Sequence, residues 1–121
     1  MFLVLIFSIL VAGTRGFDAD AIVQAACAAS ATNGHFVSAI RKPCGTGPSC
    51  NTLCQNAIGS MRDIYGNQGS STGSCFQAFH FYYKYSPQTP GSTGKAQLAM
   101  YRYANGCDGT SCGPNFCCCQ A

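Results

Sequence analysis

The sequence contains no glutamate and no tryptophan, and charged residues make up only 9% of it. No two carboxylates stand at a spacing that suits paired-acid catalysis such as glycoside hydrolysis. The formal net charge of +3 is small and scattered, which excludes a nucleic-acid footprint and a polybasic membrane patch. We therefore expect a non-enzymatic protein with no cofactor and no nucleic-acid partner. The only acidic side chains are Asp18, Asp20, Asp63 and Asp108.

Metal-ligating patterns are missing as well. No two cysteines have the C-x-x-C spacing of a zinc site, and His35 and His80 stand alone, outside any ligand spacing. We expect no bound metal. Because His80 lies within a run of aromatic residues, its expected role is in packing or hydrogen bonding.

A single long hydrophobic run is present, at the start of the chain. Residues 1–12 contain one polar side chain and are too few to span a bilayer, but they suit the apolar part of a secretory signal. The small residues of Gly13-Thr14-Arg15-Gly16 follow, so we predict a signal peptide over 1–16 and one disulfide-rich domain over 17–121. Cleavage after Gly13 is the alternative. Since no second apolar run of about 18 residues follows, we expect a secreted, extracellular protein without a membrane span.

Cysteine is the most informative residue type. All ten cysteines follow the predicted signal, and an even number in a secreted chain predicts five disulfide bridges with no free thiol. Ten cysteines allow on the order of a thousand pairings, so counting does not give the connectivity. The predicted disulfide cysteines are Cys27, Cys44, Cys50, Cys54, Cys75, Cys107, Cys112, Cys117, Cys118 and Cys119.

Two segments have the pattern of helices. Residues 20–31 are rich in alanine, begin with acidic residues and are followed by the helix stop Asn33-Gly34. Residues 50–61 carry apolar side chains at the spacing of one buried stripe, and Ser49 is the expected N-cap. In the first helix, the face that we expect to be buried consists of Ile22, Val23, Ala26 and Cys27.

Strand-forming residues dominate the rest. A short strand is expected over 36–40, and two longer runs, 76–85 and 96–104, flank a segment rich in proline and glycine. We predict that these two runs form a hairpin. Residues 76–85 also fit helical spacing, which is the alternative. The predicted fold is α+β: a small disulfide-rich domain with two helices packed on a short antiparallel sheet.

The spacing of four cysteines predicts a staple. Cys50 and Cys54 share a helix face, and Cys117 and Cys119 share a strand face, so two parallel bridges can join the two elements in either order. Cys118 points to the opposite strand face and would tie a further layer to the sheet. The staple resembles the cystine-stabilised motif of defensins and scorpion-type toxins, and the resemblance covers these four positions.

The aromatic run allows two interpretations. Exposed tyrosines are flat surfaces on which sugar rings stack, whereas buried ones would form the core of a chain that has no tryptophan. We favour the core. The residues concerned are Tyr82, Tyr83, Tyr85, Tyr101 and Tyr103.

The C-terminal third carries a second resemblance. Tyr101-Arg102-Tyr103, followed by the run from Cys112 to the cysteine triplet 117–119, is similar to small secreted cysteine-rich proteins of molluscan mantle and shell matrix. The resemblance implies an extracellular structural or matrix role without catalysis, with a matrix polymer or other matrix proteins as partners. The alternative is a host-defence peptide or toxin built on the defensin-like staple.

Overall fold

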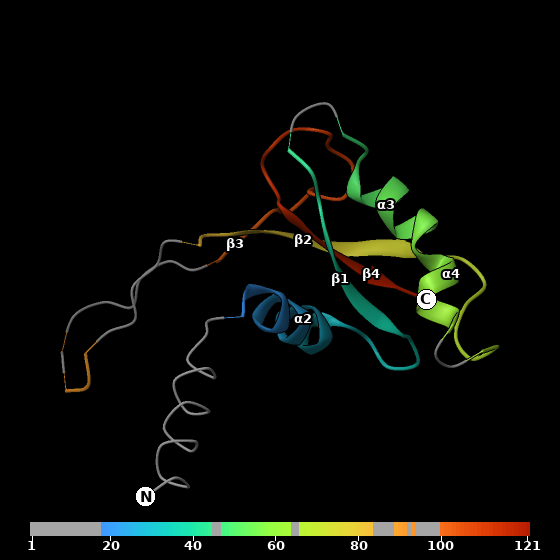
Figure 1. Cartoon of the computed structure of the whole chain (residues 1–121), viewed down its shortest axis with the longest axis horizontal. Coiled ribbons are helices and arrows are strands. Elements are labelled where there is room, and N and C mark those ends of the chain that lie inside the picture. The colour runs from blue at the N-terminus through green and yellow to red at the C-terminus, as the bar shows by residue number, and fades with distance from the viewer. Residues whose placement is uncertain (1–17, 45–46, 64–65, 84–88, 92, 94–99) are drawn as a thin grey trace, which may run out of the picture.

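The computed structural model describes residues 18–44, 47–63, 66–83, 89–91, 93 and 100–121. The predicted signal peptide over 1–16 lies outside the described residues. Four strands form one antiparallel sheet in the order β1-β4-β2-β3, with α2 on one face and α3 and α4 on the other (Figure 1). The elements are α2 (Ala19–Ser30), β1 (Val37–Arg41), α3 (Cys50–Asn56), α4 (Ile58–Asp63), β2 (Ser74–Phe81), β3 (Met100–Arg102) and β4 (Phe116–Gln120). The predicted α+β class, with helices packed on an antiparallel sheet, is confirmed.

Helix α2 begins where the sequence predicts it. The Asp18 carboxylate accepts a hydrogen bond from the Ala21 N–H (3.2 Å), which satisfies one of the free amides of the first turn. Ile22, which we expected on the buried face, is 36% exposed. The buried side chains of α2 are spaced four residues apart and point in nearly the same direction. Because neighbouring helical residues point about 100° apart, Ile22 points away from that direction, toward solvent. The residues that are buried are Ala19, Val23 and Cys27.

The helix predicted over 50–61 is present but interrupted at Ala57. The Ala57 N–H bonds to the carbonyls of both Leu53 and Cys54, and such a shared bond is common where a helix ends or tightens. As predicted, Ser49 is the N-cap, and its hydroxyl accepts from the Thr52 N–H (3.3 Å). The predicted stripe packs against the sheet across the interruption; it consists of Cys50, Leu53, Cys54, Ala57, Ile58 and Met61.

The predicted pairing of 76–85 with 96–104 is confirmed, although the strands are shorter. Strand β2 pairs with β3 antiparallel, with His80 opposite Tyr101, and the helical alternative for 76–85 is wrong. Residues 84–88 and 94–99 lie outside the described residues, so the predicted loop between the strands is described only in part. The strand expected at 36–40 is β1, one residue later than predicted.

Strand β4 is central, with β1 on one side and β2 on the other. Because successive strand residues point to opposite faces, its three cysteines contribute to two separate cores. The core under α2 includes Val23, Cys27, Phe79, Phe81, Phe116 and Cys118. The core under α3 and α4 includes Cys50, Cys54, Met61, Ala78, Cys117 and Cys119.

Among the described residues, no helix is both long enough and apolar enough to cross a membrane.

Candidate functional site

The ten cysteines form five disulfide bridges, and none of them is free. Two parallel bridges, Cys50–Cys117 and Cys54–Cys119, join α3 to β4 with Cα–Cα distances of 5.4 and 5.2 Å. The predicted staple is therefore confirmed, and its order is fixed. The other bridges are Cys27–Cys118, Cys44–Cys112 and Cys75–Cys107.

The bridge between Cys27 and Cys118 gives the staple a counterpart on the other face of the sheet. It joins α2 to β4 across 91 residues of sequence, as the alternation of the cysteine triplet requires. Helices on both faces are thus covalently tied to one central strand. Five bridges in a chain of 121 residues are typical of a small cysteine-rich protein of the extracellular type.

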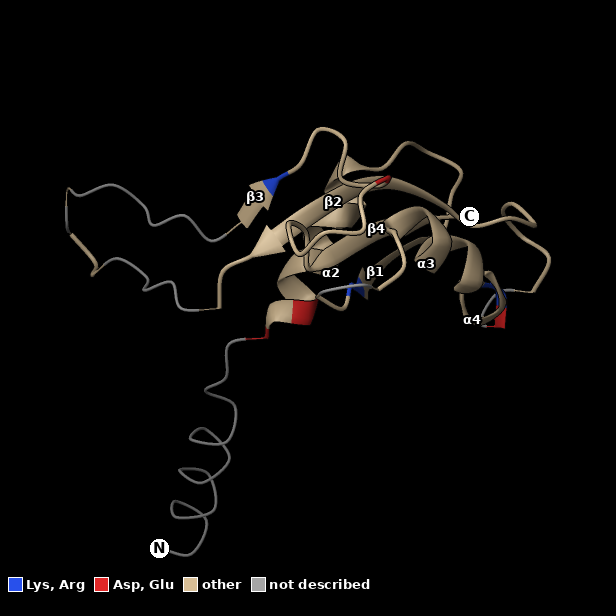
Figure 2. Ribbon diagram, turned by 90° about the horizontal axis from the view of Figure 1, so that it is seen from above, with Lys and Arg blue, Asp and Glu red and all other residues tan. Residues whose placement is uncertain are grey.

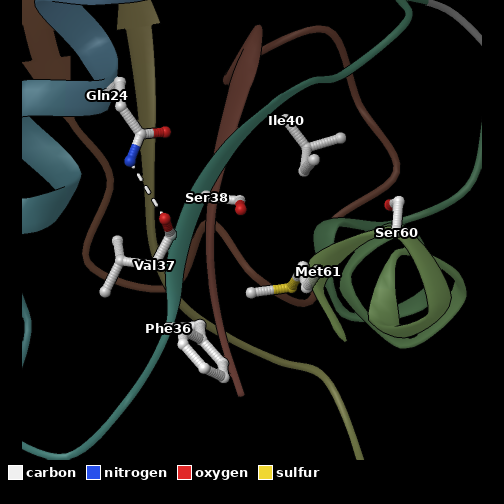
Figure 3. Close-up of a pocket in the computed structure, with 7 residues that line it drawn as sticks. All are labelled: Gln24, Phe36, Val37, Ser38, Ile40, Ser60 and Met61. Carbon is white, nitrogen blue, oxygen red and sulfur yellow. Dashed lines mark hydrogen bonds between the residues drawn. The ribbon is translucent and has the colours of Figure 1, made fainter. Parts of the chain in front are cut away.

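Strand β1 lies at the edge of the sheet, and a side chain binds its outer backbone groups. Phe36 and Ala121 exchange both backbone hydrogen bonds, so even-numbered residues of β1 bond toward β4 and odd-numbered residues face outward. Gln24 Nε2 donates to the Val37 carbonyl (2.9 Å), and Gln24 Oε1 accepts from the Ala39 N–H (2.7 Å) (Figure 3). A further antiparallel strand would also bond to the Val37 carbonyl and the Ala39 N–H. The Gln24 carboxamide therefore occupies the position of a backbone peptide group of such a strand.

Shallow pockets lie on both sides of the same edge. Figure 3 shows the pocket of about 310 Å³ between β1 and α4, which Ile40 and Met61 both line. A second, of about 530 Å³, lies beside Ala28 and Ala31 of the α2 end, and a third, of about 260 Å³, adjoins Gly69. Phe36 lines all three pockets, and together we call them the β1 groove.

Three tyrosines are exposed near the β2–β3 pair. Tyr82, Tyr83 and Tyr101 are 39%, 48% and 50% exposed. Tyr82 packs on His80, which lies opposite Tyr101, whereas Tyr83 packs on the buried Phe81. We call Tyr82 and Tyr101 the tyrosine surface. Phe79 and Phe81 of the same run are buried, so the expectation that the aromatic run forms core is right for these phenylalanines and wrong for the three tyrosines. Tyr103 is half-buried, and Tyr85 lies outside the described residues. The period-two alternation of a strand explains the division only in part, because Tyr82 and Tyr83 follow β2, whereas Tyr101 lies within β3.

The two histidines lie at different places in the fold. His80 Nδ1 is 2.6 Å from the Gly113 carbonyl oxygen, which confirms the hydrogen-bonding role predicted for it, whereas His35 lines the β1 groove. Asp108 accepts a hydrogen bond from the Asn51 side chain (2.7 Å). Among the described residues, no three side chains of metal-ligating type gather closely enough to hold an ion.

Charges are sparse over the described surface (Figure 2). Arg41 and Asp20 form an exposed ion pair (2.9 Å), and the hydrogen bond to Asp20 raises the pKa of the guanidinium. Lys42 is only 4% exposed, and its Nζ donates to the Ser111 carbonyl (2.7 Å). The ion pair links the start of α2 to the end of β1, and Lys42 anchors the loop before β4.

Comparisons of the chain with protein family models, with curated proteins and with solved structures found no match. The function is therefore inferred from the geometry of the chain itself. Gln24 is the residue of interest that the sequence did not predict. Its signal was slight: it is the one amide side chain in the apolar stretch 21–29.

Proposed function

We propose that this chain is a secreted, non-enzymatic structural protein of an extracellular matrix, with the organic matrix of a molluscan shell or mantle as its setting. The observation that carries the proposal is the tyrosine surface, Tyr82 and Tyr101, on a scaffold held by five bridges. Exposed aromatic side chains mark interaction surfaces, and a phenol ring offers both an apolar face and a hydrogen-bonding hydroxyl. A neutral matrix polymer also presents apolar faces and hydrogen-bonding groups, so it can contact both parts of a tyrosine side chain.

The low charge supports dense packing in a matrix. Charged residues are 9% of the chain, so neighbouring copies repel one another weakly. The resemblance of the C-terminal third to molluscan matrix proteins supports the setting. A matrix protein that lacks acidic runs would associate with an organic framework and not directly with mineral.

The first test is where the protein accumulates. Insoluble matrix and secreted fluid from the source organism are separated, and the protein is quantified in each by mass spectrometry. We expect most of it in the insoluble fraction after washing in high salt. Recovery from the fluid alone would contradict the matrix proposal.

The second test concerns the tyrosine surface directly. The oxidised protein is sedimented with insoluble chitin, and the variant Tyr82→Ser/Tyr101→Ser is compared with Ile22→Ser, which removes an exposed apolar side chain of α2. We expect the double variant to lose most of the bound fraction and Ile22→Ser to bind like the unmodified protein. Equal loss in both variants would show that general hydrophobicity, and not this surface, causes binding.

A host-defence peptide or toxin is the second candidate, and one observation favours it. The bridges Cys50–Cys117 and Cys54–Cys119 join a helix to a strand in the arrangement that resembles defensins. Growth inhibition of bacteria and fungi at micromolar concentration would support this candidate over the matrix one. The scattered charges of Figure 2 lead us to expect no inhibition, because membrane-active defence peptides concentrate basic residues on one face.

A further inference from the structure

The outer edge of β1 is able to bind another strand, and we propose that it pairs with β1 of a second copy of this chain. The two strands run antiparallel around a two-fold axis at Ala39, and the Gln24 carboxamide closes the edge in the single chain. The inference rests on the proposed matrix function for its biological setting, and it adds the contact through which copies associate.

The backbone of β1 fits such a pairing. Val37, Ala39 and Arg41 turn their N–H and C=O groups outward, because the intervening residues bond to β4. Around the two-fold axis, Ala39 lies opposite Ala39 of the second copy, and Val37 lies opposite its Arg41. Each opposed pair exchanges two backbone hydrogen bonds, and only methyl groups meet at the axis. The two four-stranded sheets become one continuous sheet.

Charge favours a second copy over an unrelated strand. Residues 21–40 contain no Asp, Glu, Lys or Arg, so no like charges meet across the axis. The last turn of α2 has no basic residue, although its carbonyl groups give that end a partial negative charge. Antiparallel pairing brings Arg41 of the second copy opposite Val37, which lines the 530 Å³ pocket beside Ala28 and Ala31 at this helix end. To reach this helix end, Arg41 of the second copy leaves its exposed ion pair with Asp20 of its own chain, and such a surface pair contributes little.

Space is available beside the Val37 end of the edge, where two of the pockets lie. The α2 side chains that line the β1 groove are Gln24, Ala28 and Ala31, so only Gln24 is larger than a methyl group. Gln24 is exposed and can turn away from the edge. On pairing, the Val37 carbonyl and the Ala39 N–H exchange the Gln24 amide for the backbone of the second copy. Gln24 thus sets the affinity of the pair by competing for two of its hydrogen-bonding groups.

The principal test is the oligomeric state of the oxidised protein, measured by sedimentation equilibrium over a wide range of concentration. Gln24→Ala removes the competing amide, and we expect its dimer to have a Kd at least about tenfold lower than that of the unmodified protein. Gln55→Ala is the matched control, because Gln55 is an exposed glutamine on α3, away from the edge. Its Kd should equal that of the unmodified protein.

A second variant tests whether β1 is the contact. Ala39→Pro deletes an outward N–H without removing a bond to β4, and edge strands tolerate proline at such positions. Adding Ala39→Pro to Gln24→Ala should abolish the dimer. If that variant fails to fold, hydrogen exchange of the Gln24→Ala protein replaces it: the Val37 and Arg41 amides should slow as concentration rises, while those of Ser38 and Ile40 stay constant.

Three results overturn the inference: a dimer that survives Ala39→Pro, a Gln24→Ala protein that associates no more than the unmodified one, or an edge that binds an unrelated extended peptide but never a second copy. The matrix proposal is judged separately, by fractionation. A protein that stays in the secreted fluid yet dimerises through β1 contradicts the matrix proposal alone. A matrix protein that remains a single chain contradicts this inference alone.

Discussion

Asn115 binds both backbone polar groups of Phe81 with its side-chain carboxamide. Its Oδ1 accepts from the Phe81 N–H (2.7 Å), and its Nδ2 donates to the Phe81 carbonyl (3.0 Å). The Asn115 N–H also donates to the Phe79 carbonyl (2.9 Å). These bonds continue the pairing of β2 with β4 beyond Phe116, where β4 begins.

Replacing Asn115 should weaken the end of the sheet. Asn115→Ala removes two partly buried hydrogen bonds, and we expect the free energy of unfolding to fall by about 1–3 kcal/mol. Asn115→Asp keeps an acceptor for the Phe81 N–H but sets a carboxylate oxygen against the Phe81 carbonyl, so at neutral pH its loss should be at least as large. Thermal unfolding measures both, with the exposed Asn67→Ala as control. Equal melting temperatures for all variants would contradict the structural role.

The bridges should be reduced in an order set by their exposure. Cys44 and Cys112 are both exposed, whereas the six cysteines of the bridges from α2 and α3 to β4 are fully buried. A thiolate must reach a sulfur to attack it, so under native conditions the Cys44–Cys112 bridge should open first. Partial reduction, alkylation and peptide mapping give the order. Early loss of the Cys27–Cys118 bridge would contradict the packing around it.

Removing a buried bridge should cost more than removing a partly exposed one. The variant Cys54→Ala/Cys119→Ala opens a link between residues 65 apart, and we expect a loss of about 4 kcal/mol. Cys75→Ala/Cys107→Ala is the comparison, because it opens a link of 32 residues between half-buried cysteines and should cost about 0.6 kcal/mol less from chain entropy alone. Chemical denaturation measures both. The reverse ranking would refute this account.

Gly73 should not tolerate a side chain. A Cβ at this position would overlap the backbone carbonyl of Cys54, which is tied to β4 and has little freedom to move. Gly73→Ala should therefore lower the free energy of unfolding by about 1–3 kcal/mol. Gly59 lies in α4 with nothing near its absent Cβ, so Gly59→Ala should raise it by about 0.5–1 kcal/mol. Changes of the same sign in both variants would contradict the prediction.

The sequence predicts local geometry far better than it predicts which strands meet. The staple follows from two local spacings, four on a helix and two on a strand, so Cys50, Cys54 and their partners could be predicted together. For the Cys27–Cys118 bridge, the sequence predicts the sheet face to which Cys118 points but does not identify its partner. The pairing of Cys44 with Cys112 depends on loops, for which no periodicity applies.

Failures in the prediction have the same origin. Ile22 is exposed because α2 is oriented by its contacts with the sheet and not by its own apolar pattern. Gln24 is far from Val37 in sequence, and its two bonds to β1 depend on how the helix crosses the strand. The position of β4 between β1 and β2 likewise involves residues far apart in the chain.

That position of β4 has a consequence for how the chain folds. Strands β1 and β2 do not pair with each other; each pairs with β4, which is the last element in chain order. The β2–β3 hairpin can form early, but β1 cannot join it until β4 is added between β1 and β2. Folding dominated by such long-range contacts is slow. During that interval the cysteines of α2 and α3 await their native partners, and a disulfide isomerase that corrects premature pairings should therefore raise the yield of the native protein.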